Sequence, residues 1–381
     1  MNEQPIPGKT LRMVDLEAVG VEVEPSALGQ PGGPSISYAR IGGFPPMILR
    51  APIFLNQPGF AALFPDGPVR RYIPTMYVMQ ACFLAGPFGM VCTPDGTLVR
   101  QSILRPESSI LLYALEHMKE AFPGREGVWT WAQHPVVSLN GFGTDNYFHF
   151  LTDTISQTFL DEHVPAAAAA KFVLSGFAPE QQARFAFMGQ AIARAGIPAS
   201  RFQPYDGTMM FCQQLLFPKR ESGMTPWRYA HLRKMLGVAP HPNPTRRLYI
   251  ARPGGWRRRI PEEPQICAML ESYGFEAINP GDLSFEAQIE AFRSARIVAG
   301  PHGAAMTNAM FMNPGGAMVE LTHEKRVMIT FHEVAGASRL HYACVVGDML
   351  ETPDQPPLFS DFSVNVDVVE AAVKAAIAAT S

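Results

Sequence analysis

The sequence has few cysteines, no long apolar run and little net charge, and each of these absences excludes a class of protein. Its five cysteines are scattered along 381 residues without a Cys-x-x-Cys pair, which argues against a disulfide framework or a zinc site and indicates a reduced, cytoplasmic setting. The longest apolar run, 77–92, is interrupted by glycine and proline and is too short to cross a bilayer. The net charge of −3, with no wide basic face, indicates a protein that does not bind nucleic acid.

Two further patterns are missing. Residues 1–23 lack the basic and then apolar order of a signal peptide, so we expect a cytoplasmic protein without a transmembrane segment. Peripheral association with the inner face of the plasma membrane stays open. The chain contains no Asp-x-Asp pair, which is the usual sign of a diphosphate held through a metal ion. We therefore expect neither a metal nor another cofactor.

The composition that remains is that of a folded α/β protein. Apolar residues make up 47% of the chain and charged residues 17%, which suffices for packed cores, and the length suggests two domains. Three prolines within 240–244 form a stiff connector. The predicted divisions are an N-terminal domain over 1–238, a second domain over 239–345, and a C-terminal tail and helix over 346–381.

The second domain has the clearer pattern, because strands and helices alternate there with short loops. This alternation predicts a parallel sheet covered on both faces, with ligands at the carboxyl ends of the strands. A last helix over 367–380 is expected to pack back on the body. The strands are expected at 247–251, 275–278, 296–300 and 317–321, and the helices at 262–273, 284–295 and 304–312. In the first domain we expect strands at 47–54, 76–83, 98–103 and 135–139, and helices at 109–121, from 146 onward and at 180–195.

The most informative stretch is 298–308, where a buried strand runs into Gly-Pro-His-Gly and a helix follows. Free backbone N–H groups of Gly303, Ala304 and Ala305 at that helix start favour an anion such as a diphosphate. His302 can donate to a phosphate oxygen, and Asn308 lies one turn further on. The alternative is a tight strand-to-helix turn with a capping histidine.

A second stretch, 249–259, places Arg252 just past a strand end and adds Arg258 and Arg259 in the same loop. Guanidinium groups bind phosphate oxygens in pairs of hydrogen bonds, so this loop also suits a diphosphate. Without a metal, fixed cations would have to neutralise the charge of a departing diphosphate. The alternative is a solvated basic loop.

Two sites with carboxylates complete the set. His149 and Asp153 are four residues apart on one helix face, with Asn146 one turn earlier, so either could deprotonate a hydroxyl or Asp153 could orient His149. The alternative is a local His–Asp pair without a catalytic role. Glu320 ends a predicted strand and could accept hydrogen bonds from sugar or ribose hydroxyls, or simply face water.

The order of these motifs resembles glycosyltransferase family 61, which includes bacterial capsular polysaccharide biosynthesis proteins. The segment 146–153 is similar to the family's Asn-Tyr-Tyr-His-Trp-x-x-Asp motif. The resemblance spans about 140–325 and continues through Tyr249 to Arg252, Arg258 to Ile260, Leu283 to Gln288, Ile297 to Ala304, Phe311 to Gly315, and Val319 to Leu321. The chain departs from the family at Ala251, Glu262 and the segment 305–306.

The resemblance implies a GT-B fold, in which two Rossmann-like domains face each other across a cleft, and an inverting, metal-independent transfer. The first domain would be the acceptor side, with Asp153 and His149 catalytic, Asp153 favoured over His149 as the base, and Asn146 nearby. The second would bind a nucleotide sugar, with UDP favoured, through Arg252, Arg258 or Arg259, His302 to Ala305, Asn308 and Glu320. The expected reaction is hexosyl or pentosyl transfer to a glycan or lipid-linked glycan, in capsular or cell-surface polysaccharide biosynthesis. A non-catalytic nucleotide-sugar or glycan-binding protein and a GT-B-like sugar-nucleotide epimerase are the alternatives.

Overall fold

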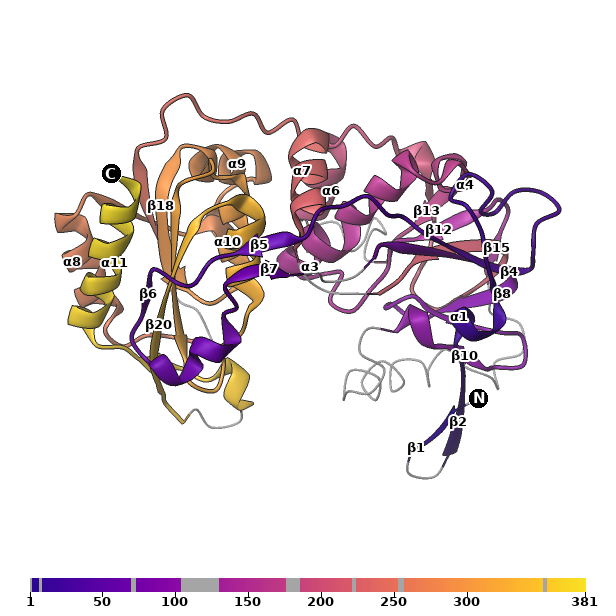
Figure 1. Cartoon of the computed structure of the whole chain (residues 1–381), viewed down its shortest axis with the longest axis horizontal. Coiled ribbons are helices and arrows are strands. Elements are labelled where there is room, and N and C mark those ends of the chain that lie inside the picture. Colours follow the sequence, from indigo (N-terminus) through magenta and orange to yellow (C-terminus); the bar gives the residue numbers. More distant parts are fainter. Residues whose placement is uncertain are drawn as a thin grey trace. The chain divides into compact units, whose positions relative to one another are not determined.

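The computed structural model describes residues 2–6, 9–69, 73–103, 130–175, 186–220, 224–252, 257–351 and 355–381 (Figure 1). The chain folds as two compact α/β units. Unit 1 contains residues 1–44 and 72–222, and unit 2 contains 45–71 and 223–381. These units differ from the predicted domain boundaries, because 45–71 and 223–238 belong to unit 2. The expected helix over 109–121 and residues 180–185 of the one over 180–195 lie outside the described residues.

Unit 1 is built on a mixed sheet in which β8 and β15 form a long antiparallel pair at the centre. On one side of this pair, β15, β12, β13 and β14 run parallel to one another, and β4 pairs antiparallel with β8 on the other side. Tyr77, Met79, Leu215 and Phe217 are buried in its core. The strands are β1 (Asn2–Ile6), β2 (Lys9–Val14), β3 (Val21–Glu22), β4 (Ile36–Arg40), β8 (Thr75–Ala85), β9 (Met90–Cys92), β10 (Leu98–Val99), β11 (Thr130–Ala132), β12 (Val136–Ser138), β13 (Lys171–Val173), β14 (Phe202–Gln203) and β15 (Met209–Pro218).

The helices of unit 1 are short. The predicted helical segment from 146 onward exists but changes type along its length. It begins as α3 (Tyr147–His149), continues as a π-helix over Phe150–Thr154, and ends as a 3₁₀ helix over Ile155–Glu162. The other helices described are α1 (Leu16–Val19), α4 (Pro165–Ala169), α6 (Ala186–Arg194) and two short 3₁₀ helices, Arg100–Ser102 and Ala199–Arg201.

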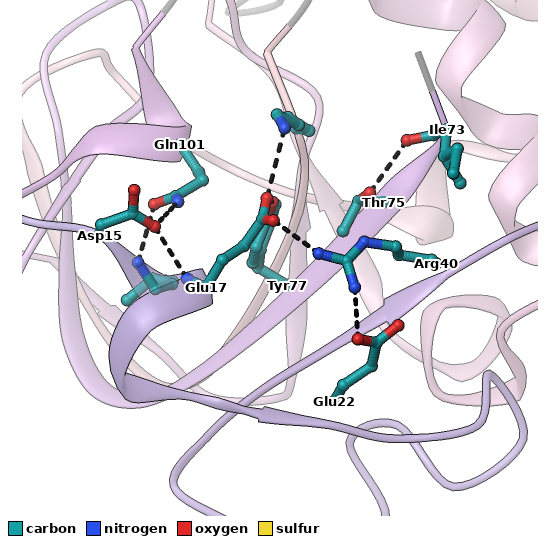
Figure 2. Close-up of polar contacts among 10 residues, drawn as sticks. Asp15, Glu17, Glu22, Arg40, Ile73, Thr75, Tyr77 and Gln101 are labelled. Atoms are coloured by element: carbon teal, nitrogen blue, oxygen red, sulfur yellow. Dashed lines mark hydrogen bonds and ion pairs between the residues drawn. The ribbon is translucent and has the colours of Figure 1, made fainter.

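A charged network anchors α1 to the sheet of unit 1 (Figure 2). The Glu17 carboxylate accepts a hydrogen bond from the Tyr77 hydroxyl at 2.5 Å and pairs with Arg40 at 2.7 Å and Lys219 at 3.3 Å. Burial alone would raise the pKa of Glu17, but these partners outweigh it and lower the pKa. The ionised carboxylate therefore stabilises this corner of the unit.

Unit 2 contains the parallel sheet that the sequence predicts. Its strand order is β17-β16-β18-β19-β20, all parallel, with β6 parallel to β20 and β21 antiparallel to it. The strands are β6 (Phe54–Leu55), β16 (Arg246–Ile250), β17 (Phe275–Ile278), β18 (Ala295–Pro301), β19 (Ala317–His323), β20 (His341–Met349) and β21 (Phe362–Ser363). The four strands expected after the linker are confirmed, and β20 is an additional strand.

Helices cover both faces of this sheet. α11 (Val366–Thr380) packs on β19 and β20 and lies beside α8 (Glu263–Ser272), so the C-terminal helix does pack back on the body (Figure 1). The other helices described after residue 223 are α7 (Pro226–Met235), α9 (Phe285–Arg293), α10 (Thr330–Ser338) and three 3₁₀ helices, Pro280–Asp282, Ala304–Phe311 and Pro357–Phe359. The predicted helix over 304–312 is thus of the 3₁₀ type.

The segment 45–71 joins unit 2 although it precedes most of unit 1 in the sequence. Its strand β6 extends the main sheet beside β20, and β5 (Met47–Leu49) pairs with β7 (Gly67–Val69) in a small separate sheet. A 3₁₀ helix over Pro58–Leu63 lies between them. Leu49 packs so closely on α10 that a Cβ atom added at Gly336 would lie 2.3 Å from its side chain.

No helix in the described part of the chain combines the length and hydropathy that crossing a bilayer requires.

Candidate functional site

The strand order of unit 2 places the candidate site at a change of direction in the chain. From β16 the chain moves to β17 on one side, and from β17 it returns to β18 on the other side of β16. Ligands of parallel α/β sheets bind at the carboxyl ends of strands where the order reverses in this way. Arg252 comes two residues after β16, and His302 comes directly after β18.

His302 is held by a side-chain hydrogen bond, a ring contact and a backbone hydrogen bond. Its ring Nδ1 forms a short hydrogen bond with Glu320, and its ring lies edge-on to Phe331 with 4.9 Å between centroids. The backbone N–H donates to Leu321 at 2.8 Å. The side chain does not cap the following 3₁₀ helix, whose N-cap is Gly303 and which has no side-chain cap. The alternative of a capping histidine is therefore wrong.

Backbone donors gather immediately after His302. The N–H groups of Gly303, Ala304 and Ala305 make no hydrogen bond with any described residue. Unsatisfied donors at a helix start carry partial positive charge and suit an anion. The guanidinium of Arg252 lies against this turn, since a Cβ atom added at Gly303 would be 3.5 Å from its Cζ and Nη1.

The positive charge of Arg252 is largely uncompensated by its surroundings. Its Nη1 is buried and has no hydrogen-bond partner among the described residues. Burial lowers the pKa of Arg252, and the charge of Glu263 acts in the opposite direction. A buried guanidinium nitrogen without a partner is costly, so this position favours an incoming anion.

Arg258 joins the same group, whereas Arg259 does not. Arg258 Nη1 donates to the His302 carbonyl at 2.6 Å, and its pKa falls to about 9 because of burial and of the charges of Arg252, Arg326 and Arg257. Its φ of 54° is the left-handed conformation, which non-glycine residues adopt at a cost and often at functional sites. Arg259 instead pairs with Asp361 at 2.7 Å and is 64% exposed. The structure thus brings Arg252, Arg258 and His302 together and leaves Arg259 balanced by a carboxylate.

Arg326 is a member of this cluster that the sequence analysis missed. It follows β19 by three residues, and its Nη1 donates to the Leu358 carbonyl at 2.5 Å. Burial lowers its pKa, Glu320 raises it and Arg252 lowers it, so its charge acts on the same group. Next to it, His323 is fully buried with no described partner for either ring nitrogen. The sequence did offer a signal for Arg326, because it is a basic residue just past the end of a third predicted parallel strand.

Glu320 and Asn308 are both buried, with exposures of 1% and 0%. Glu320 lies within β19, where its carboxylate pairs with His302 and accepts from the Tyr342 hydroxyl at 2.5 Å, so the alternative of a water-facing charge is wrong. Asn308 donates to Gln288 at 2.8 Å. Because both Glu320 oxygens have protein partners, a direct contact with a ligand would have to use a second lone pair of a buried oxygen.

In unit 1, His149 and Asp153 form the expected pair. His149 Nδ1 lies 2.7 Å from Asp153 Oδ2, and Asp153 Oδ1 accepts from the Thr152 hydroxyl at 2.9 Å. Asp153 belongs to the π-helical turn, a distortion that is frequent at functional sites. The side chains of His149 and Asp153 are 26% and 14% exposed, so solvent reaches both. Asn146 caps α3 by accepting from the Phe148 N–H at 2.9 Å.

Gly143 shapes the surroundings of His149. Its φ of 73° is left-handed, and a Cβ atom there would lie 2.7 Å from His149 Cδ2. The turn before α3 therefore needs glycine both for its backbone and for the position of the imidazole. Within the described ranges, no three His, Cys, Asp or Glu side chains are grouped as ligands of a metal ion.

Part of the chain is similar to a known protein family. The model of a family described as Glycosyltransferase 61 matches residues 147–319, a range that includes His149, Asp153, Arg252 and His302. No curated protein matches the chain.

Proposed function

Because the chain belongs to glycosyltransferase family 61, we propose that this glycosyltransferase moves a hexosyl or pentosyl group from a nucleotide sugar, with UDP favoured, to a glycan hydroxyl. The transfer inverts the anomeric carbon and requires no metal. Under this proposal the chain has a GT-B architecture, with unit 2 as the donor-binding part and unit 1 as the acceptor side. The acceptor is a glycan or lipid-linked glycan of capsular or cell-surface polysaccharide synthesis, reached from the cytoplasm at the inner face of the membrane.

One observation carries the donor part of the proposal. Arg252, Arg258 and His302 converge at the carboxyl ends of neighbouring strands, beside three backbone N–H groups without described partners. As the bond between the sugar and the diphosphate breaks, negative charge grows on the diphosphate. Fixed cations and oriented N–H groups in a buried site stabilise that charge, which is the role that a metal ion has in other transferases.

His149 and Asp153 are proposed to activate the acceptor. Asp153 Oδ2 pairs with His149 Nδ1, and Asp153 Oδ1 lies 2.9 Å from the Thr152 hydroxyl, which lies equally close to the Phe148 carbonyl. This arrangement favours His149 Nε2 as the atom that takes the proton of the acceptor hydroxyl, with Asp153 holding the imidazole and stabilising its positive charge. The hydroxyl oxygen then bonds to the anomeric carbon from the face opposite the diphosphate, which leaves with the electron pair of the broken bond.

The test is mass spectrometry of donor and acceptor mixtures, with and without EDTA. We expect sugar transfer that EDTA does not abolish, and a loss of about 100- to 1,000-fold in Arg252→Ala. Arg293→Ala, which removes an arginine paired with Glu290 on the surface of α9, is the matched control. Strict dependence on manganese or magnesium would refute the metal-independent proposal. Conversion of the donor without acceptor would identify an epimerase, and binding without turnover a non-catalytic binding protein.

The base is tested separately. Asp153→Asn and His149→Ala should each lower turnover by about 100-fold or more while nucleotide binding persists. Unchanged turnover in both variants would refute the assignment. A larger loss in His149→Ala than in Asp153→Asn would support His149 as the proton acceptor.

A further inference from the structure

The imidazole of His302 has one fixed nitrogen and one unassigned nitrogen. Nδ1 faces the Glu320 carboxylate, which can only accept, so Nδ1 carries a proton. Nε2 has no hydrogen-bond partner among the described residues. Any change in the protonation of this side chain therefore occurs at Nε2.

The contacts of Glu320 keep its carboxylate bonded to His302 Nδ1. Its second oxygen accepts from Tyr342 at 2.5 Å, and burial together with the nearby Glu320 charge raises the pKa of Tyr342 far above its usual value. Tyr342 therefore stays a donor at every working pH. With both oxygens engaged and an exposure of 1%, Glu320 cannot turn away from His302 without leaving a buried hydrogen bond unmade.

The charges that face His302 come from several elements. Glu320 on β19 favours the imidazolium, whereas Arg258 from the loop after β16, and Arg326 and His323 from the end of β19 onward, oppose it. α10 places the apolar ring of Phe331 edge-on to the imidazole, and its His332 also lies within the influence of the Glu320 charge. Burial lowers the pKa of His302 most strongly, Glu320 raises it, and Arg326 and Arg258 lower it again, so the net pKa lies below the usual value. Without a ligand, His302 is neutral at neutral pH.

A diphosphate would reverse this balance. Its oxygens offset the charges of Arg258 and Arg326 and add negative charge close to the imidazole, while Glu320 remains on the other side. An imidazolium between two anions is favoured, since opposite charges within a few ångströms stabilise the charged form.

Resting on the proposed function, we infer that His302 takes up a proton from solvent at Nε2 when the nucleoside diphosphate binds, and that Glu320 is the positioning residue for this uptake. The site then gains a cation only while it is occupied. Donor binding weakens as pH rises, because binding is coupled to proton uptake and the proton concentration falls.

The experiment begins by finding a nucleotide that binds. UDP, GDP, ADP and dTDP are screened by thermal shift, since a ligand that prefers the native state raises the melting temperature. If none binds, the proposed donor class fails, and this inference fails with it. For a nucleotide that does bind, calorimetric titrations in Tris and HEPES at about pH 8 give the number of protons taken up. The terminal phosphate, with a pKa of about 6, is already ionised there.

We expect the wild-type protein to take up protons when the diphosphate binds, and His302→Asn to take up none. Glu320→Gln keeps a hydrogen-bond acceptor for Nδ1 but removes the charge. Its affinity should fall about tenfold near pH 8 and recover near pH 6, because one pKa unit corresponds to a factor of ten. A merely structural role of Glu320 would lower the affinity equally at both pH values. Glu276→Gln, at an exposed carboxylate of β17 paired with Arg246, is the matched control and should behave as wild type.

Diphosphate binding without proton uptake in the wild-type protein would overturn the inference and leave the proposed function intact. Equal uptake in wild type and His302→Asn would also overturn it, because another group would then be the proton acceptor. If Glu320→Gln does not fold, the comparison of wild type with His302→Asn decides the matter alone.

Discussion

Gly303→Ala tests whether the turn after β18 is the place where the donor phosphates lie. Gly303 has a φ of 177°, which is extended backbone that alanine adopts readily. The nearest atoms that a Cβ would meet are the Cζ and Nη1 of Arg252 at 3.5 Å, an ordinary van der Waals contact. The substitution should therefore change the free energy of unfolding by no more than about 0.5 kcal/mol.

Binding should change far more than stability. The added methyl group would stand beside the N–H groups of Gly303 to Ala305, which have no described partners, and against the Arg252 guanidinium, where the donor phosphate is proposed to lie. Displacing that phosphate loses about one charge-assisted hydrogen bond, worth about 1.5–3 kcal/mol, or roughly a 10- to 150-fold weaker affinity.

The assay is calorimetric titration of the nucleotide, together with urea unfolding of each variant. Gly189→Ala in α6 is the matched control, because a Cβ there meets nothing within 4 Å. Unchanged affinity in a folded Gly303→Ala protein would refute the placement of the diphosphate at this turn. A large loss of stability would refute the reading of the local packing instead.

Three further predictions follow from particular contacts. Gly143→Ala should lower turnover about 100-fold or more, because a Cβ atom would lie 2.7 Å from His149 Cδ2 and displace the imidazole. Nucleotide affinity, measured by calorimetry, should be unchanged. Equal losses of turnover and of affinity would contradict a role confined to the acceptor side. Glu17→Gln should lower the free energy of unfolding by about 0.5–1.5 kcal/mol at pH 7. The pKa of Glu17 is lowered in the folded protein, so its stabilisation is present above the unfolded pKa of about 4.3 and is lost as pH falls through the folded pKa. The urea midpoints of variant and wild type should therefore converge in acid. A difference that stays constant with pH would contradict this. Gly336→Ala should destabilise unit 2 by about 1–3 kcal/mol in thermal melts, since its Cβ would lie 2.3 Å from Leu49, and Leu49→Ala in the same chain should restore part of the loss.

The sheet of unit 2 was accessible from the sequence because its strands are short apolar runs separated by helices with clear ends. Gly274 ends α8, and Ser284 caps α9 by accepting from the Ala287 N–H, so local chemistry marked both boundaries. The carboxyl-end positions of Arg252 and His302 followed directly from those strands. Local signals of this kind fix the order of elements and hence which loops gather at one edge.

Pairings between distant segments could not be predicted from local sequence signals. β6 lies beside β20, with Phe54 opposite Ala343, although most of unit 1 separates them in sequence. Two residues of strand carry no local sign of such a partner. The missed Arg326 has a similar cause, because a basic residue in a loop looks like a solvated charge until the strand before it is placed beside β18.

Glu320 is a buried carboxylate within a parallel strand, and strand alternation explains which side of the sheet it faces. Val319 and Leu321 point into the apolar core that α11 covers, so Glu320 faces the opposite side of the sheet, where Tyr342 also lies. A buried carboxylate in a parallel strand costs several kcal/mol unless it is paired, and apolar residues would fill the position with less loss of stability. The sequence nevertheless places there one carboxylate, one hydroxyl and one imidazole that satisfy one another. Packing gives no reason for this choice, whereas the proposed role of His302 in binding the diphosphate does.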